Sequence, residues 1–139
     1  KTYEVKVDRI GKWNVSVKTP VAGGPYTISV SNGKETKVIK NILIGEVWLC
    51  SGQSNMEMPL KGFFGQPVKG GNNEVVRSTN NNIRFITVPR STVLKPESDF
   101  EGSWQVASPR TTGSFSATAW YFGSLLQEVL QKWVCSHSF

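Results

Sequence analysis

The sequence contains one histidine and two cysteines in 139 residues, and these shortages limit the kinds of site it can form. Cys50 and Cys135 are far apart in the sequence and do not make a disulfide framework. Cys50 ends a short apolar run, where a free cysteine commonly behaves as a small buried hydrophobe. One histidine and two distant cysteines do not supply a set of metal ligands, so we expect no metal site.

The sequence also lacks a starting Met, a secretory signal and an apolar run long enough to span a membrane. We therefore expect a fragment or a processed product. The net charge is +6, from 16 Lys plus Arg against 10 Asp plus Glu, but the cations are scattered and do not alternate with aromatic residues. This pattern favours a solvated surface over a nucleic-acid partner, and it leaves the attraction of an anionic sugar open.

The first third of the chain has the period-two alternation of half-buried antiparallel strands. Apolar and polar residues alternate over 3–7, 13–17 and 26–30, and Thr36 begins a returning strand. Asn32-Gly33 predicts a hairpin turn, because both residue types accept a positive φ angle. We expect residues 1–43 to form a segment of an antiparallel β-sandwich.

A change of pattern follows at residues 45–60. Val47 to Cys50 form a continuous apolar run, which predicts a strand buried on both faces in a parallel sheet. Ser51 and Gly52 break the run, and Gln53 to Met58 predict one helical turn before Pro59. Hydrolytic α/β enzymes present a nucleophilic serine in this way, with backbone N–H groups close to the developing oxyanion. The alternative reading of the same spacing is a plain capped turn.

The remaining elements are predicted from local signals. We expect a short helix near 73–78 capped by Asn72 or Asn73, a strand over 83–88, and a brief extended piece at 104–107. Spacings of three and four residues predict an amphipathic helix over about 115–132, capped by Ser114 or Ser116. Its expected core stripe consists of Phe115, Ala119, Phe122, Leu126, Val129, Leu130 and Trp133. Phe63 and Phe64 could stack on a sugar or pack down their own loop.

The string Gly-Glu-Val-Trp-Leu-Cys-Ser-Gly-Gln-Ser-Asn-Met-Glu at 45–57 resembles the nucleophile block of the sialate O-acetylesterase family, which are SGNH-type carbohydrate esterases. Phe115 to Gly123 also resembles the first long helix of that family. The resemblance implies that Ser54 is the catalytic nucleophile and that its own backbone N–H joins the oxyanion hole. It leaves the substrate-binding residues and the oligomeric state unassigned.

The same resemblance implies an α/β fold, with residues 44–139 forming the start of an SGNH-hydrolase (flavodoxin-like) parallel-sheet domain after the 1–43 segment. The implied reaction is hydrolysis of O-acetyl esters on sialic acid or other carbohydrates, which needs no cofactor. The implied partner is an O-acetylated carbohydrate. The implied location is secreted, periplasmic or lysosomal. A rival interpretation is a non-catalytic, β-rich carbohydrate-binding or interaction fragment in which Ser54 is a turn residue.

The later catalytic blocks of the family have no match. The resemblance covers about residues 10 to 131, after which the chain ends in Val134-Cys135-Ser136-His137-Ser138-Phe139. The family's Asp-x-x-His block would need an Asp at position 134, so we interpret His137 as a tail residue and not as the base for Ser54. Glu57 follows Ser54 by three residues, which suggests a capping-box role for its side chain.

Overall fold

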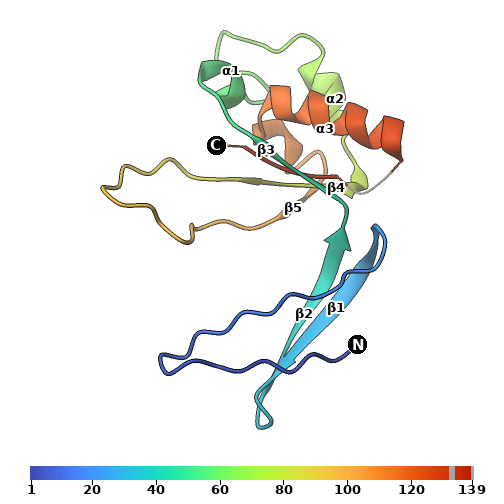
Figure 1. The fold of residues 1–139 in the computed structure, drawn as a ribbon. Coiled ribbons are helices and arrows are strands. Elements are labelled where there is room, and N and C mark those ends of the chain that lie inside the picture. Colours follow the sequence, from blue (N-terminus) through green and yellow to red (C-terminus); the bar gives the residue numbers. More distant parts are fainter. Residues whose placement is uncertain (132–133, 139) are drawn as a thin grey trace.

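The computed structural model describes residues 1–131 and 134–138. Three helices lie over one sheet, and a second, separate sheet lies on the side away from the helices (Figure 1). One sheet has two strands, β1 and β2, and the other has four strands in the order β3-β6-β4-β5. The strands are β1 (Gly23–Ser31), β2 (Thr36–Ile44), β3 (Glu46–Cys50), β4 (Asn80–Thr87), β5 (Gln105–Ala107) and β6 (Val134–Ser138). The helices are α1 (Ser54–Glu57), α2 (Gly71–Arg77) and α3 (Ala117–Leu130), with a 3₁₀ turn at Thr112–Ser114. The expected mixed α/β class is confirmed.

The β1–β2 hairpin confirms the predicted turn at Asn32-Gly33. The turn is longer than expected, and it does not have a positive φ angle at both of these residues. Its loop runs over residues 32–35, where the Asn32 N–H donates to the Glu35 carbonyl at 3.2 Å. The Asn32 side-chain oxygen accepts from the backbone N–H groups of Lys34 and Glu35 at 2.9 and 2.8 Å. Only Gly33 takes a left-handed φ, of 87°. The loop is therefore stabilised by an Asn side chain that closes an Asx turn.

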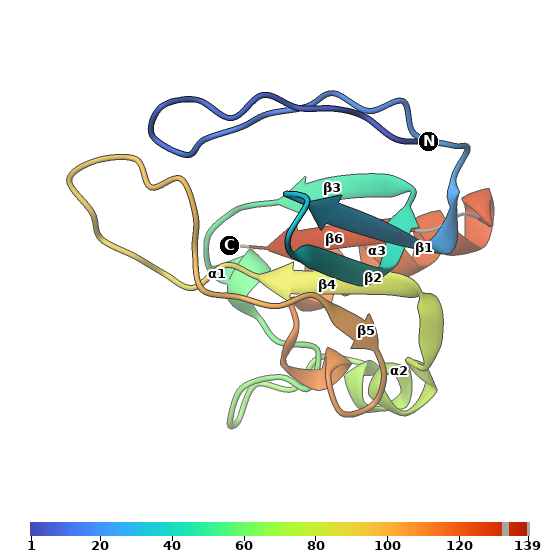
Figure 2. The same cartoon turned by 90° about the horizontal axis from the view of Figure 1, so that it is seen from below.

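The strands expected within residues 1–22 are wrong, because no described residue of that segment is in a strand. The segment folds back at Asp8, whose side chain accepts from the N–H groups of Ile10 and Lys12, and its two arms run alongside each other (Figure 2). Ile10 is 76% exposed and Trp13 is 51% exposed. The alternating pattern of this segment is therefore not accompanied by strand pairing among the described residues.

The four-stranded sheet carries parallel strands at its centre. β6 pairs in parallel with both β3 and β4, so that Ser138 lies opposite Cys50 on one side and opposite Thr87 on the other. The carboxyl ends of β3 and β4 therefore lie at one edge of the sheet. The interpretation of residues 134–138 as a tail is wrong, since their backbone forms the strand between β3 and β4.

The expected burial of β3 on both faces is also wrong. β3 is an edge strand with β6 as its neighbour, and Val47 and Leu49 are 64% and 59% exposed. Trp48 points to the opposite face, where its ring meets Phe122 of α3 edge-on at 5.1 Å. A strand with a continuous apolar run is buried on both faces only when other elements cover both faces. Here α3 covers the face that carries Trp48, and the face that carries Val47 and Leu49 is exposed.

The core lies between α3, β4 and the segment after α1. Its buried members are Leu60, Ile83, Phe85, Ala107, Phe115, Ala117, Ala119 and Trp120. The helix prediction is confirmed, as is the Ser116 cap, whose hydroxyl accepts the Ala119 N–H at 3.4 Å. The predicted stripe is only partly buried, because the second half of α3 extends past the core and leaves Val129 70% exposed. Trp133 lies outside the described residues.

The other local predictions have mixed outcomes. β4 and β5 confirm the strand and the extended piece, and β4 begins earlier than expected, at Asn80. α2 confirms the short helix, but its cap is Gly70 at φ 76°, and not Asn72 or Asn73. A Cβ on Gly71 would lie 2.1 Å from the Leu60 carbonyl oxygen. The start of α2 therefore packs directly against the backbone of the segment that follows α1.

Candidate active site

Ser54 lies just beyond the carboxyl end of β3, where the sequence predicted it. β3 ends at Cys50, residues 51–53 form the turn, and α1 begins at Ser54. The Gln53 carbonyl accepts the N–H groups of Met56 and Glu57 at 2.8 and 3.2 Å, which closes the helical turn. Ser54 itself is exposed. Open α/β sheets carry their ligands at this edge, so the position is suited to a reacting side chain.

The beginning of α3 holds the Ser54 turn in place. The Thr118 hydroxyl donates to the Asn55 carbonyl at 3.1 Å, and the Ala117 N–H donates to the Met58 carbonyl at 2.8 Å. Gly52 gives the turn room, because a Cβ there would lie 2.6 Å from Cγ of Met56. The turn is therefore fixed by the longest helix of the structure rather than by its own short helix.

The Ser54 backbone N–H is available to an incoming ligand. Within residues 1–131, no carbonyl or side chain accepts this N–H, and no side chain hydrogen-bonds to the Ser54 hydroxyl. A free N–H beside an exposed hydroxyl can stabilise negative charge on a bound carbonyl oxygen. The hydroxyl still needs a base, and the one histidine of the sequence, His137, lies on β6 opposite Leu49 and Ile86 in the strand register.

Glu57 does not form the expected capping box, since no side-chain hydrogen bond caps α1. Its carboxylate instead forms an ion pair with Arg90, which follows β4. The side chains of Arg90 and Glu57 are 78% and 38% exposed, so the pair contributes little to stability. It does bring the connection between β4 and β5 to the Ser54 turn. Sequence reasoning missed this contact, and the only available signal was that both residues follow strands whose carboxyl ends share one edge.

Burial raises the pKa of two groups in the structure. Desolvation raises the pKa of the Cys50 thiol, which is free and lies at the end of β3. Desolvation, followed by the negative charge of Glu74, raises the pKa of the Tyr121 hydroxyl. Both shifts keep the groups neutral at physiological pH, so neither supplies a charge to the Ser54 turn.

No hydrogen bond, ion pair or ring contact of the described residues joins Ser54 to the exposed side chains of the neighbouring loops. Phe64 is fully exposed and Phe63 is 51% exposed, so the alternative that both pack down their loop is wrong for Phe64. Asp99 and Glu101 lie exposed on the connection between β4 and β5. In the described part of the chain, no group of three potential metal ligands occurs and no helix is long and apolar enough to cross a membrane.

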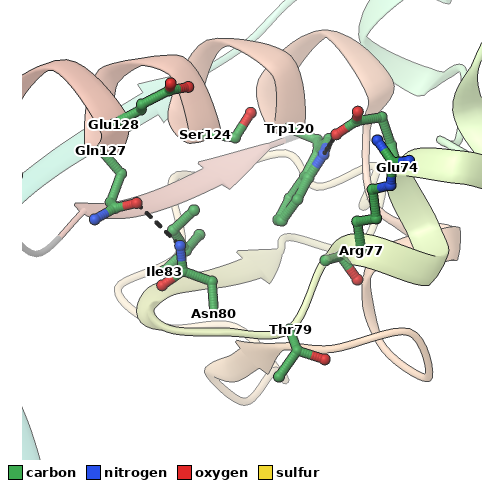
Figure 3. A pocket seen from close by; sticks show the side chains of 10 residues that line it. Glu74, Arg77, Thr79, Asn80, Ile83, Trp120, Ser124, Gln127 and Glu128 are labelled. Carbon is green, nitrogen blue, oxygen red and sulfur yellow. Dashed lines mark hydrogen bonds between the residues drawn. The ribbon is translucent and has the colours of Figure 1, made fainter.

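Two cavities flank the core, and Ser54 lines neither of them. The first, the Arg77 cavity, has a volume of about 250 Å³ and lies where β4 begins (Figure 3). It is lined by Glu74, Arg77, Ser78, Thr79, Asn80, Ile83, Trp120, Ser124, Gln127 and Glu128. The second, the Arg110 cavity, has a volume of about 420 Å³ and lies where β4 ends. It is lined by Phe85, Thr87, Gly102, Ser103, Gln105, Arg110, Thr111, Ser114 and Phe115.

Comparison with known proteins identifies the relatives of this chain. No protein-family model matches it. It is 28% identical over 131 residues to the sialate O-acetylesterase of Rattus norvegicus, covering 86% of this chain and 23% of the relative. It is also 28% identical over 134 residues to the sialate O-acetylesterase of Homo sapiens, covering 86% of this chain and 24% of the relative. The chain therefore spans about a quarter of the length of these curated relatives.

A solved structure agrees with this result. A carbohydrate acetylesterase from Xanthomonas citri superposes with a TM-score of 0.86 at 29% identity, covering 94% of this chain and 29% of that chain. The curated relatives and the solved structure are thus all named as acetylesterases. The resemblance expected from residues 45–57 is confirmed: the chain is similar to part of the sialate O-acetylesterases and to part of this carbohydrate acetylesterase.

Proposed function

We propose that this chain is the Ser54-bearing part of a serine esterase that removes acetyl groups from hydroxyls of sialic acid or other carbohydrates. The observation that carries the proposal is an exposed serine, with an unused backbone N–H, in a fixed turn beyond the carboxyl end of β3. The names of the relatives supply the reaction and the substrate class. No cofactor is needed for this chemistry.

In the proposed reaction, Ser54 Oγ attacks the acetyl carbonyl carbon while a base takes the hydroxyl proton. The carbonyl oxygen becomes an oxyanion, and the Ser54 N–H donates a hydrogen bond to it. Collapse of this intermediate breaks the bond to the sugar oxygen, which receives the proton and leaves as a free hydroxyl. Water then attacks the acetyl-serine, releasing acetate and restoring Ser54.

The domain assignment belongs to the same proposal. We infer that residues 44–139 begin an SGNH-type, flavodoxin-like sheet and that residues 1–43 belong to a separate β-rich segment. The parallel pairing of β6 with β3 and β4 supports the first part. The hairpin β1–β2, which forms its own sheet, supports the second. A secreted, periplasmic or lysosomal location is proposed from the resemblance alone.

The test is a serine replacement in the longest natural protein that contains this chain. We expect Ser54→Ala to lower kcat/KM for an aryl acetate and for an acetylated sialic acid by about a thousandfold or more, because no neighbouring group can replace Oγ in the acyl-enzyme. Ser51→Ala is the matched control, since Ser51 lies in the same turn before α1. Similar rates for Ser54→Ala and Ser51→Ala would refute the assignment.

A further inference from the structure

We propose that the Arg77 cavity binds a free basic amino acid of the lysine type, at a site separate from the Ser54 turn. The cavity is lined by Asn80, where β4 begins, whereas Ser54 lies at the edge of the sheet where β3 and β4 end. The inference does not rest on the proposed function, because the binding it describes does not involve Ser54.

The Arg77 cavity combines a fixed apolar floor with charged side chains. Ile83 and Trp120 line it and are only 2% and 4% exposed. The Trp120 ring N–H donates to Glu74 Oε2 at 3.4 Å, which orients both the ring and the carboxylate (Figure 3). The volume of about 250 Å³ is just below the range of sites for drug-sized ligands, so the cavity suits a small metabolite.

The neutral polar side chains of the lining are mostly occupied by contacts within the protein. The hydroxyls of Ser78 and Ser124 each donate to the backbone carbonyl three residues earlier, at 2.7 and 3.3 Å. Asn80 Nδ2 donates to Gln127 Oε1 at 3.0 Å. The groups left for a ligand are therefore mainly charged, which favours an ionic ligand over a neutral polyol.

Three charged side chains line the cavity, and each keeps capacity for a ligand. Arg77 and Glu128 make no ion pair or hydrogen bond within residues 1–131, and Glu74 uses only Oε2 for Trp120. Two carboxylates and one guanidinium give the lining a net charge of −1. A ligand with two cationic groups and one anionic group complements this set, and lysine has this composition in its α-ammonium, α-carboxylate and side-chain ammonium.

The charged groups are also placed in the order in which lysine carries its charges. Glu74 and Arg77 are three residues apart on α2 and lie at one end of the cavity beside Trp120, and Glu128 lies at the other end (Figure 3). Glu128 follows Trp120 by eight residues on α3, which is about 12 Å along the helix. The α-carboxylate accepts the parallel N–H donors of Arg77, and the α-ammonium donates to Glu74. The aliphatic chain then passes over Ile83 towards Glu128.

The experiment is a titration of the ¹⁵N-labelled 139-residue chain with L-lysine, L-norleucine and cadaverine at low salt, followed by amide NMR. Norleucine lacks only the side-chain ammonium of lysine, and cadaverine lacks only the α-carboxylate. We expect saturable shifts at residues lining the Arg77 cavity, with lysine binding about tenfold more tightly than either analogue, because each analogue loses one charged contact.

Variants assign each contact to its residue. Glu128→Gln should remove the preference for lysine over norleucine, and Arg77→Gln should remove the preference for lysine over cadaverine. Arg110→Gln, in the Arg110 cavity, is the matched control and should leave both preferences unchanged. A dispersed spectrum verifies the fold of each variant.

The possible outcomes distinguish a built site from general attraction of cations. Equal affinity for lysine and norleucine, no effect of Glu128→Gln or Arg77→Gln, shifts centred away from the Arg77 cavity, or no saturable shift would each overturn the proposal. Ser54→Ala should bind lysine as the unmodified chain does. A failure of the esterase assignment would therefore leave this result intact, and an active esterase without lysine binding would refute the amino-acid site alone.

Discussion

Arg84 of β4 holds Asn41 of β2 with both of its terminal nitrogens, and this contact joins the hairpin to the four-stranded sheet. Nη1 donates to the Asn41 carbonyl at 2.5 Å and Nη2 donates to the Asn41 side-chain oxygen at 2.7 Å. Asn41 has a left-handed φ of 62°, and Arg84 Nε is buried with no hydrogen-bond partner among the described residues. β3 begins soon after Asn41, so the contact fixes the strand that leads to Ser54.

We predict that Arg84→Met lowers the free energy of unfolding by about 1–3 kcal/mol, because two hydrogen bonds from a charged donor are lost. Asn41→Gly removes the side-chain acceptor without adding backbone strain at positive φ. A double-mutant cycle from urea unfolding should give a coupling energy above about 0.5 kcal/mol. Arg9→Met, at an exposed arginine in the first arm, is the control. Additive effects of the Arg84 and Asn41 changes would show that the contact does not join the two parts.

The features that can be predicted from the sequence are those that depend on residues close together in the chain. Ser116 as a helix cap and Ser54 at the start of a helical turn can be recognised because the relevant atoms lie within a few residues. The Arg84–Asn41 contact joins residues 43 positions apart, and no local pattern indicates it. The apolar run at Val47 predicts burial on both faces, but such a pattern does not show how many neighbours the strand has in the sheet.

The position of two leucines relative to the core predicts that replacing each by alanine changes the free energy of unfolding by very different amounts. Leu60 is 0% exposed and Leu94 is 104% exposed. Leu60→Ala should lower the free energy of unfolding by about 2–5 kcal/mol, since it leaves a cavity at the centre of the core. Leu94→Ala should change it by less than about 0.5 kcal/mol. Urea or thermal unfolding measures both, and equal effects would contradict the placement of the core.

The raised pKa of Cys50 predicts slow alkylation. Burial disfavours the thiolate, so in a Cys135→Ser background the iodoacetamide rate should have its midpoint above the ordinary pH range of a cysteine. The midpoint should fall when urea unfolds the chain. Since the thiol pKa is raised in the folded state, its contribution to stability is present at low pH and is lost as the pH rises through the folded value. Equal midpoints in the folded and unfolded states would disprove the burial of the Cys50 thiol.

We expect the 139-residue chain alone to hydrolyse an aryl acetate at a rate close to that of buffer, because a serine hydroxyl without a general base is a poor nucleophile at neutral pH. His137→Ala should leave this low rate unchanged. The comparison matters because His137 lies on β6, opposite Leu49 of the strand that leads to Ser54. Turnover well above background that disappears in His137→Ala would contradict this expectation and would assign His137 as the base.

The most direct measurement is to locate the acetyl group during turnover. The longest natural protein that contains this chain would be mixed with an acetyl ester, quenched in acid within the first turnovers, digested and sequenced by mass spectrometry. The account predicts an acetyl group on Ser54, absent from Ser54→Ala and present in Ser51→Ala. Ester hydrolysis with no acetylated Ser54, or with the acetyl group on another residue that survives Ser54→Ala, would contradict the assignment of Ser54 as the nucleophile.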